Sequence, residues 1–274
     1  MSHPVLRLFD GSDSTAPQLR EDVKVLQTLL NKDGWSLRAD GVFGRDTESA
    51  VRLFQNEHGL ADDGIVGPQT WSVLLGTEAP DAATTLMTTF SADDPSLMDQ
   101  LTRATEFKTF IDPAGAQTGL QPAVIGGIGS RESQWGLALK PAGPAGTGDF
   151  APRRFPTQFR QGATPPDGGG FGRGLMQIDF DAQEFARTGN WQNPAENILV
   201  GCKILAGFRG LIQRKTNVAG LPLLQAAIAS YNAGPGNVLR AIQDGRDVDF
   251  FTAGRNYSRD VLNRAGWFQL KGWT

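Results

Sequence analysis

An eight-residue turn sequence occurs twice near the start of the chain, with the copies 23 residues apart. Residues 40–47 read DGVFGRDT and residues 63–70 read DGIVGPQT, so both copies share the frame D-G-[IV]-[FV]-G-x-x-T. The glycines permit a tight turn, and Pro68 suits the first position of a helix. Each copy therefore predicts a turn that starts a helix, over residues 48–57 and 71–75.

A further helix is predicted before the first copy. Leu19, Val23, Leu26 and Leu30 form one apolar stripe at helical spacing over residues 19–30. The resulting three-helix unit, about residues 19–76, resembles the small peptidoglycan-binding module attached to many cell-wall hydrolases. The resemblance implies that this part of the chain binds bacterial peptidoglycan. The alternative is that each turn residue is only structural.

The composition changes after residue 76. Residues 76–95 are rich in Thr, Ala, Asp and Pro and have no sustained period, which is typical of a linker. We therefore expect a module over residues 1–76, a linker over 77–94 and a second domain over 95–274. Helical patterns recur over residues 96–111, 121–136, 194–214, 221–232 and 254–268, so the fold class is mainly α.

A long irregular loop interrupts the second domain. Fifteen of the 34 residues between 141 and 174 are Gly or Pro, a composition that no regular helix tolerates. Loops of this length inside a compact domain usually carry function.

Several classes of chemistry are excluded by the scarce residues. The chain has one cysteine, Cys202, and two histidines, His3 and His58, so residues 59–274 contain no histidine. Zinc hydrolases and Cys–His or Ser–His–Asp nucleophiles need such residues. We expect no metal and no organic cofactor, and a net charge of −3 gives no reason to expect nucleic-acid binding. Carboxylates remain as candidates for proton transfer.

Glu132 is the first such candidate. It lies in the last turn of the helix expected over 121–136, with Ile128 and Trp135 four residues before and three after it. Apolar surroundings raise the pKa of a carboxyl group and keep a proton available near neutrality, as a general acid requires. The alternative is a helix-end residue paired with Arg131.

Three motifs follow one another along the second domain. Residues 132–136 read ESQWG, residues 174–178 read GLMQI, and residues 231–238 read YNAGPGNV. This order is typical of the lysozyme-like superfamily that includes goose-type lysozymes and soluble lytic transglycosylases, and the resemblance covers about residues 95–270. It implies an α-helical lysozyme-like domain, with Glu132 as the catalytic acid and with Ser133, Gln177, Tyr231 and Asn232 along the sugar groove.

The second carboxylate decides the reaction. Asp179 directly follows GLMQI, as in goose-type lysozymes, and Asp149 ends a GTGD stretch that matches a second family position, whereas Asp167 lies closer to GLMQI. We favour Asp149 over Asp167. These residues favour a muramidase that hydrolyses the β-1,4 bond between N-acetylmuramic acid and N-acetylglucosamine with inversion. The alternatives are a lytic transglycosylase that forms 1,6-anhydromuramic acid, and a non-catalytic wall-binding or virion structural protein.

The module order resembles that of a bacteriophage endolysin of a Gram-negative host. No apolar run approaches the roughly 20 residues that span a bilayer, and Arg7 and Asp10 interrupt the first apolar stretch. We therefore expect a monomer without stable membrane insertion and without a signal peptide. It would be synthesised in the host cytoplasm and act on the cell wall after release.

Overall fold

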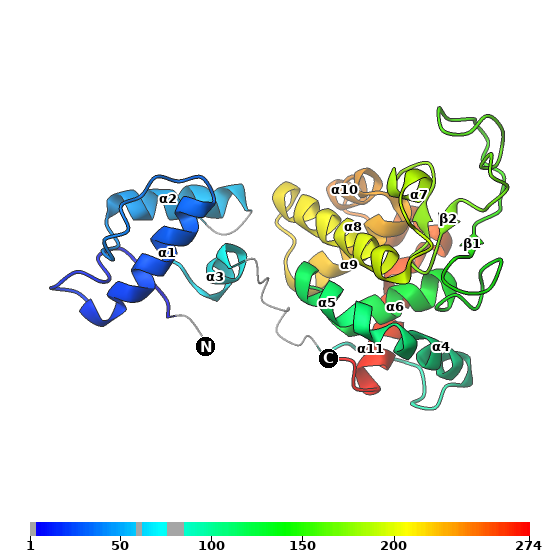
Figure 1. The fold of residues 1–274 in the computed structure, drawn as a ribbon, viewed down its shortest axis with the longest axis horizontal. Helices are drawn as coiled ribbons and strands as arrows, with labels where there is room; N and C mark the ends of the chain where they lie inside the picture. The colour runs from blue at the N-terminus through cyan, green and yellow to red at the C-terminus, as the bar shows by residue number, and fades with distance from the viewer. Residues whose placement is uncertain (1–3, 59–61, 76–84) are drawn as a thin grey trace. The chain divides into compact units, whose positions relative to one another are not determined.

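The computed structural model describes residues 4–58, 62–75 and 85–274. Its contacts divide the chain into two compact units, Met1–Ala82 and Ala83–Thr274, which are drawn in Figure 1 from blue to red along the chain. A linker is expected over residues 77–94. Residues 77–84 of it lie outside the described residues, and residues 85–94 are described.

The described residues of the first unit form three α-helices. A short 3-10 helix, η1 (Pro17–Leu19), leads into α1 (Arg20–Lys32), and α2 (Arg45–Glu57) and α3 (Pro68–Leu74) each follow one copy of the repeated turn. Their apolar faces enclose one core, and the three-helix unit expected from the sequence is confirmed. The buried residues of this core are Leu6, Val23, Leu26, Leu30, Phe43, Ala50, Val51, Phe54, Val66 and Trp71.

The first turn is closed by a buried glutamine from α1. The Gln27 side-chain oxygen accepts a hydrogen bond from the Gly41 amide at 2.9 Å, and its nitrogen donates to the Val42 carbonyl at 3.1 Å and to the Thr47 hydroxyl at 3.2 Å. Gly41 has a φ of +78°, which a side chain would strain. The buried amide is therefore fully paired within the turn.

The second turn repeats this arrangement with a glutamine from α2. Gln55 accepts from the Gly64 amide at 2.9 Å and donates to the Ile65 carbonyl at 2.9 Å and the Thr70 hydroxyl at 3.2 Å. Gly64 has a φ of +73°. The repeat in the sequence is thus a repeat in hydrogen bonding.

The second unit is a helical domain with one small sheet, and the mainly α class is confirmed. Its helices are α4 (Pro95–Glu106), α5 (Lys108–Thr118), α6 (Pro122–Ser133), α7 (Phe185–Thr188), α8 (Pro194–Lys215), α9 (Gly220–Ala233), α10 (Pro235–Gln243) and α11 (Tyr257–Leu270), with 3-10 helices η2 (Val248–Phe251) and η3 (Ala253–Arg255). The single helix expected over 96–111 is wrong, because the chain breaks at Phe107 between α4 and α5. Phe107 is buried there and stacks on Trp135, with ring centroids 6.1 Å apart.

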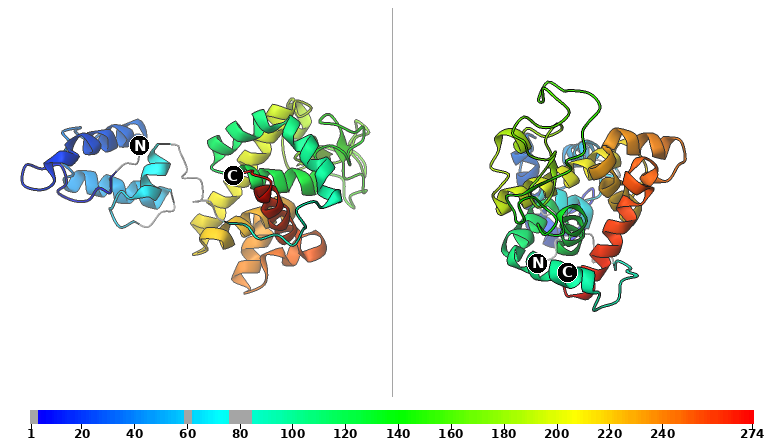
Figure 2. Two further views of the ribbon diagram at one scale, coloured as in Figure 1. Left: turned by 90° about the horizontal axis from the view of Figure 1, so that it is seen from below. Right: turned by 90° about the vertical axis from the view of Figure 1, so that its right-hand side faces the viewer.

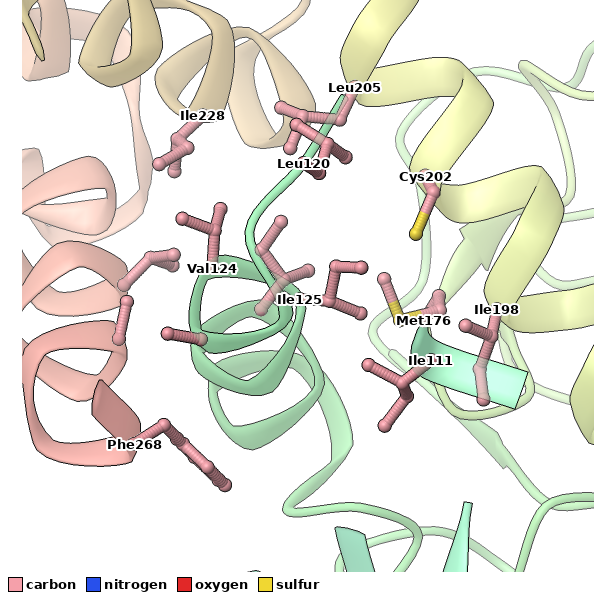
Figure 3. Close-up of a cluster of buried hydrophobic side chains, with 14 of the residues drawn as sticks. Ile111, Leu120, Val124, Ile125, Met176, Ile198, Cys202, Leu205, Ile228 and Phe268 are labelled. Atoms are coloured by element: carbon pink, nitrogen blue, oxygen red, sulfur yellow. The ribbon is translucent and has the colours of Figure 1, made fainter. Parts of the chain in front are cut away.

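Helix α6 runs through the centre of this unit, with apolar side chains on several sides (Figure 3). Its glycines let neighbouring helices approach closely. A Cβ on Gly127 would lie 2.6 Å from the Val261 carbonyl oxygen of α11, and one on Gly126 would lie 2.8 Å from the Phe268 ring. Val124 and Ile125 project from α6 toward different parts of the core. The helix that ends near Glu132 is therefore firmly held.

Three two-residue strands form an antiparallel sheet, β1 (Thr147–Gly148), β2 (Gly172–Arg173) and β3 (Ile178–Asp179), in that order. Gly148 pairs with Gly172, which in turn pairs with Asp179. The chain between β1 and β2 is the long irregular excursion at the edge of the unit in Figures 1 and 2. The predicted long loop is present, with β1 and β2 inside its expected bounds.

Residues 85–91, part of the expected linker, pack on α11. The Leu86 amide donates to the Gln269 side chain at 2.8 Å, and the Thr89 amide donates to the Asn263 side chain at 2.7 Å. Trp267 donates from its indole nitrogen to the Ser91 carbonyl at 2.8 Å. We call residues 85–91 the strap, since they lie along α11 before α4 begins.

Candidate active site

Glu132 lies in the last turn of α6, next to a residue that joins this helix end to the GLMQI segment. The hydroxyl of Ser133 donates to the Leu175 carbonyl at 2.7 Å and accepts from the Gly136 amide at 3.1 Å. Helix α6 ends there because Gln134 adopts a left-handed conformation, with a φ of +51°. Ser133 is fully buried. Its hydroxyl therefore holds two motifs together, and its expected place along the sugar groove stays a prediction.

The carboxyl of Glu132 is held in a setting that favours its protonated form. Burial raises the pKa of Glu132 to about 7, while a hydrogen bond from the Tyr257 hydroxyl and the charge of Arg131 lower it and the charge of Asp149 raises it. Arg131 does not form the alternative ion pair with Glu132, since its guanidinium lies 3.4 Å from Asp260. Glu132 therefore has the protonation behaviour of a general acid.

Trp135 does not sit where the helical spacing places it. Because α6 has already ended, Trp135 folds back along the helix, and its indole nitrogen donates to the Gly126 carbonyl at 3.1 Å. Its ring fills the space where Gly129 lacks a side chain. The hydrogen bond to the Glu132 carboxyl comes instead from a residue that is distant in the sequence.

Two tyrosines lie close to Glu132, and they are the only tyrosines in the chain. Tyr257, the first residue of α11, donates its hydroxyl to Oε1 of Glu132. Tyr231 of α9 donates to the Met176 carbonyl at 2.8 Å, within the GLMQI segment. Burial and the charge of Glu132 raise the pKa of both phenols well above their usual value, so both remain neutral donors. Sequence reasoning missed Tyr257; the rarity of tyrosine was the available signal.

Gln177 lies across the small sheet. Its side-chain nitrogen donates to the Gly174 carbonyl at 2.8 Å. A Cβ on Gly148 or Gly172 would come within 2.2 or 2.1 Å of the Gln177 side-chain oxygen. The two paired glycines therefore make room for this amide, which joins the sheet to the GLMQI turn.

Asp149 and Asp179 are brought together by an arginine of the long loop. One nitrogen of Arg153, Nη2, contacts Oδ2 of Asp149 at 3.2 Å and also Oδ2 of Asp179. The other oxygen of Asp179 accepts from the amides of Asp181 and Ala182, both at 2.8 Å. Part of Asp179 thus caps the turn that follows it. Asp149 is half-exposed and close enough to raise the pKa of Glu132.

Asp167 lies elsewhere. It forms a two-fold ion pair with the buried Arg173, at 2.8 and 2.9 Å, which holds the pKa of Asp167 below its usual value. Both residues line a cavity of about 480 Å³ that also includes Lys140 and Trp191. The structure therefore groups Asp149 and Asp179 around Arg153 and ties Asp167 to a different arginine.

Asn232 is exposed near the end of α9, where its side-chain oxygen accepts from the Ala253 amide at 2.8 Å. The helix ends at Ala233, and Gly234 has a φ of +80°. Asn232 therefore connects α9 to η3, and its amide nitrogen remains at the surface of the unit.

Each of the two units matches a known protein family. Residues 20–74 match the family model described as "Putative peptidoglycan binding domain", and residues 158–272 match the model described as "Lysozyme g". Lysozyme g of Epinephelus coioides is 32% identical over 172 residues, which cover 62% of this chain and 77% of the relative. This chain belongs to the lysozyme g family.

The other similarities cover different lengths of the chain. N-acetylmuramoyl-L-alanine amidase CwlM of Mycobacterium tuberculosis is 45% identical over 56 residues, which are 20% of this chain and 14% of that protein. The crystal structure of Burkholderia AP3 phage endolysin aligns with 97% of this chain and 99% of that chain. The sequence identity in this alignment is 18% and the TM-score is 0.23. Within the described ranges, no helix has the length and apolar character to cross a bilayer.

Proposed function

We propose that this lysozyme g family protein is a muramidase that hydrolyses the β-1,4 bond between N-acetylmuramic acid and N-acetylglucosamine in peptidoglycan. The observation that carries the proposal is a carboxyl group whose pKa is raised to about 7, Glu132, close enough to Asp149 to be affected by its charge, together with Asp179, which shares Arg153 with Asp149. An acid and a separate acceptor for water are the two requirements of an inverting glycosidase.

Glu132 acts as the general acid. Near neutral pH a substantial fraction of Glu132 carries a proton, which it gives to the glycosidic oxygen as the bond to the muramic acid carbon breaks. Tyr257 donates to the same carboxyl and holds it in one orientation. Once Glu132 has lost its proton, this hydrogen bond stabilises the carboxylate.

Asp149 and Asp179 hold the attacking water. Both carboxylates are partly exposed, so a water molecule can reach them, and both are anchored by Arg153. Attack from the face opposite the leaving group gives a product with inverted anomeric configuration. Gln177, Tyr231 and Asn232 belong to the surrounding sugar groove.

The lytic transglycosylase is the second candidate function. In that reaction the 6-hydroxyl of the muramic acid attacks instead of water, so no carboxylate is needed for water. The presence of Asp149 close to Glu132, joined through Arg153 to Asp179, favours hydrolysis. The raised pKa of Glu132 and its hydrogen bond to Tyr257 also count against a non-catalytic wall-binding or virion structural protein.

The first unit delivers the enzyme to its polymer. Residues 1–76 bind peptidoglycan, and the tether raises the local concentration of the second unit at the wall. The combination suits an endolysin that is made in the host cytoplasm, acts as a monomer without a cofactor, and reaches the wall after release.

Mass spectrometry of digested peptidoglycan tests this proposal. We expect reducing muramic acid ends, which are heavier by one water than the 1,6-anhydro ends of a transglycosylase. NMR of the initial product should show the inverted anomer. Anhydro ends alone would replace the proposal with the transglycosylase, and no cleavage by the folded full-length protein would replace it with the non-catalytic alternative.

A further inference from the structure

The long loop between β1 and β2 carries an arginine that reaches back over the sheet. Arg153 forms hydrogen bonds or ion pairs with three carboxylates: Asp149 at 3.2 Å, Asp181 at 3.1 Å and both oxygens of Asp179. Two of these belong to the proposed water site. One side chain therefore joins a loop residue, the end of β3 and the turn that follows it.

Arg153 is held in this position from two sides. Its guanidinium lies 3.8 Å from the ring centroid of Phe171, which is fully buried. Its backbone amide donates to the Ala163 carbonyl on the opposite limb of the loop at 2.9 Å. A guanidinium is planar and rigid, so it loses little conformational entropy when it packs on a ring and forms hydrogen bonds to carboxylates. Its position is thus set before any substrate arrives.

A second arginine stabilises the outer part of this arrangement. Arg160, which is nearly fully buried, donates to Asp181 at 3.0 Å and to the Gly162 carbonyl at 2.7 Å. Thr157 also donates to Asp181 at 3.2 Å. Asp181 therefore has partners without Arg153, whereas Asp149 makes its only ion pair in the described part of the chain with Arg153.

We propose that Arg153 is a positioning residue, which fixes Asp149 and Asp179 at the spacing needed to hold one water molecule and so directs the reaction to hydrolysis. This inference rests on the proposed function. Without the guanidinium, the two carboxylates repel each other and move apart. Asp149 then loses its anchor, while Asp179 keeps the amides of Asp181 and Ala182.

The chemical consequence is a choice between two nucleophiles. In hydrolysis the bond from the muramic acid carbon to the glycosidic oxygen breaks, that oxygen takes the Glu132 proton, and the water oxygen bonds to the carbon while its proton passes to the Asp149 or Asp179 carboxylate. In the competing reaction the sugar's own 6-hydroxyl bonds to the same carbon and its proton passes to the Glu132 carboxylate, so the product is anhydro and no water is consumed. A poorly held water loses to the hydroxyl, which is always attached to the substrate.

The electrostatic consequence concerns Glu132. The groups that face its carboxyl are Tyr257, Tyr231, Arg131 and Asp149. Arg153 partly neutralises Asp149, and the charge of Asp149 raises the pKa of Glu132. Removing Arg153 takes away the positive charge that offsets Asp149, so wherever Asp149 stays beside Glu132 the pKa of Glu132 rises further. Because the acid must be protonated, the alkaline limb of the pH–rate profile moves to higher pH.

The test compares Arg153→Ala with wild type in the full-length protein on purified peptidoglycan. We expect kcat to fall on the order of 10–100-fold with little change in KM, as for a small misplacement of a reacting group. The fraction of anhydro ends should rise, and the alkaline limb should shift upward. A purely structural role would lower the melting temperature without changing the product ratio.

Arg154→Ala is the matched control. Arg154 is the next residue of the same loop, its guanidinium lies 5.3 Å from the Phe155 ring, and it has no ion pair among the residues that the structure describes. It should keep the wild-type rate and product ratio. Arg153→Lys keeps the charge, but a single ammonium group cannot form hydrogen bonds to two carboxylates in the geometry of a guanidinium. Its ratio of anhydro to reducing ends should therefore lie between those of wild type and Arg153→Ala.

The outcomes separate this inference from the proposed function. A wild type that forms only anhydro ends contradicts the proposed hydrolysis itself. A wild type that hydrolyses, with a folded Arg153→Ala that keeps its rate and product ratio, contradicts only the role of Arg153. If Arg153→Ala fails to fold, the decision passes to Arg153→Lys, for which a wild-type product ratio overturns the inference and a raised anhydro fraction supports it.

Discussion

The repeated turns of the first unit and the carboxylate cluster of the second unit use polar side chains in opposite ways. Gln27 and Gln55 are buried, and each amide is paired within its own turn. Asp149 and Asp179 remain partly exposed and share one guanidinium, and the charge of Asp149 raises the pKa of Glu132.

The difference separates stability from chemistry. A fully paired buried amide has no capacity left for a ligand, so it serves the fold. Crowded charges that keep part of their surface in water are costly to the fold and available to a substrate. Changes in the turns should therefore affect unfolding, and changes in the cluster should affect turnover.

The largest expected effect is on Glu132, the proposed catalytic acid. Glu132→Gln should lower kcat by about 10²–10⁴-fold, because the amide has no acidic proton to give the leaving oxygen. Since folding raises the pKa of Glu132 from 4.5 to about 7, the native carboxyl destabilises the fold progressively as pH rises across that window. Glu132→Gln should therefore melt at a higher temperature than wild type at pH 8, with a smaller difference at pH 4.

The exposed Glu184 of the same unit offers a control for this substitution. Glu184→Gln should leave both kcat and the pH dependence of melting unchanged. If Glu132→Gln retained more than about a tenth of the wild-type rate, the catalytic acid would have to be another residue.

The next effect is on the turns. Gln55→Leu leaves the buried Gly64 amide and Ile65 carbonyl without their partner, which should cost about 1–3 kcal/mol in the free energy of unfolding of the first unit. Gln27→Leu should lower the free energy of unfolding of the first unit by a similar amount, because Gln27 forms the corresponding hydrogen bonds in the first turn. Calorimetry of the full chain should show a lower first-unit transition with unchanged kcat on soluble glycan fragments. Gln18→Leu, at an exposed position, is the control, and equal melting of all three variants would refute the structural role of the turns.

A smaller effect is expected from the phenol beside the acid. The Tyr257 hydrogen bond lowers the pKa of Glu132, so Tyr257→Phe should raise that pKa. The alkaline limb of the pH–rate profile should then move above its wild-type midpoint near pH 7. Tyr231→Phe is the control, because the Tyr231 hydroxyl donates to the Met176 carbonyl and not to Glu132. The alkaline limb of the pH–rate profile of Tyr231→Phe should therefore stay at the wild-type pH. The reverse pattern would contradict the assigned hydrogen bond.

The smallest effect on chemistry is expected from removing the first unit. A chain beginning at residue 85 should keep the wild-type kcat on soluble fragments and degrade intact sacculi less efficiently at low enzyme concentration. The truncation has to retain the strap, because a start at residue 90 would delete Leu86 and its hydrogen bond to Gln269. Equal activity on sacculi across a concentration series would show that the first unit does not target the enzyme.

Local patterns carried most of the fold prediction. Each of these patterns spans only a few residues: the apolar stripe of α1, the repeated turn frame and the three motifs. Helices α1, α2 and α3 form where the stripe and the two turns predict them. The end of α6 and the break at Phe107 depend on distant packing, since Phe107 and Trp135 leave helical geometry as they bury their rings together. Periodicity carries no information about such contacts.

The candidate site was predictable only in part for the same reason. Glu132 lies within a motif and Asp179 directly follows one, whereas Tyr257 meets Glu132 across 125 positions and Arg153 meets Asp179 across 26. Arg153 belongs to a loop that has no periodicity from which a direction could be inferred. The choice between Asp149 and Asp167 likewise depended on which arginine each one meets.

The strap has a mechanical consequence for an enzyme tethered to a polymer. Tension along the chain from a wall-bound first unit enters the second unit at Leu86, which is joined to Gln269 of α11. Helix α11 in turn packs along α6, the helix that carries Glu132. The hydrogen bonds of Leu86, Thr89 and Ser91 to α11 therefore carry such a load first, and it reaches α4 only when they break.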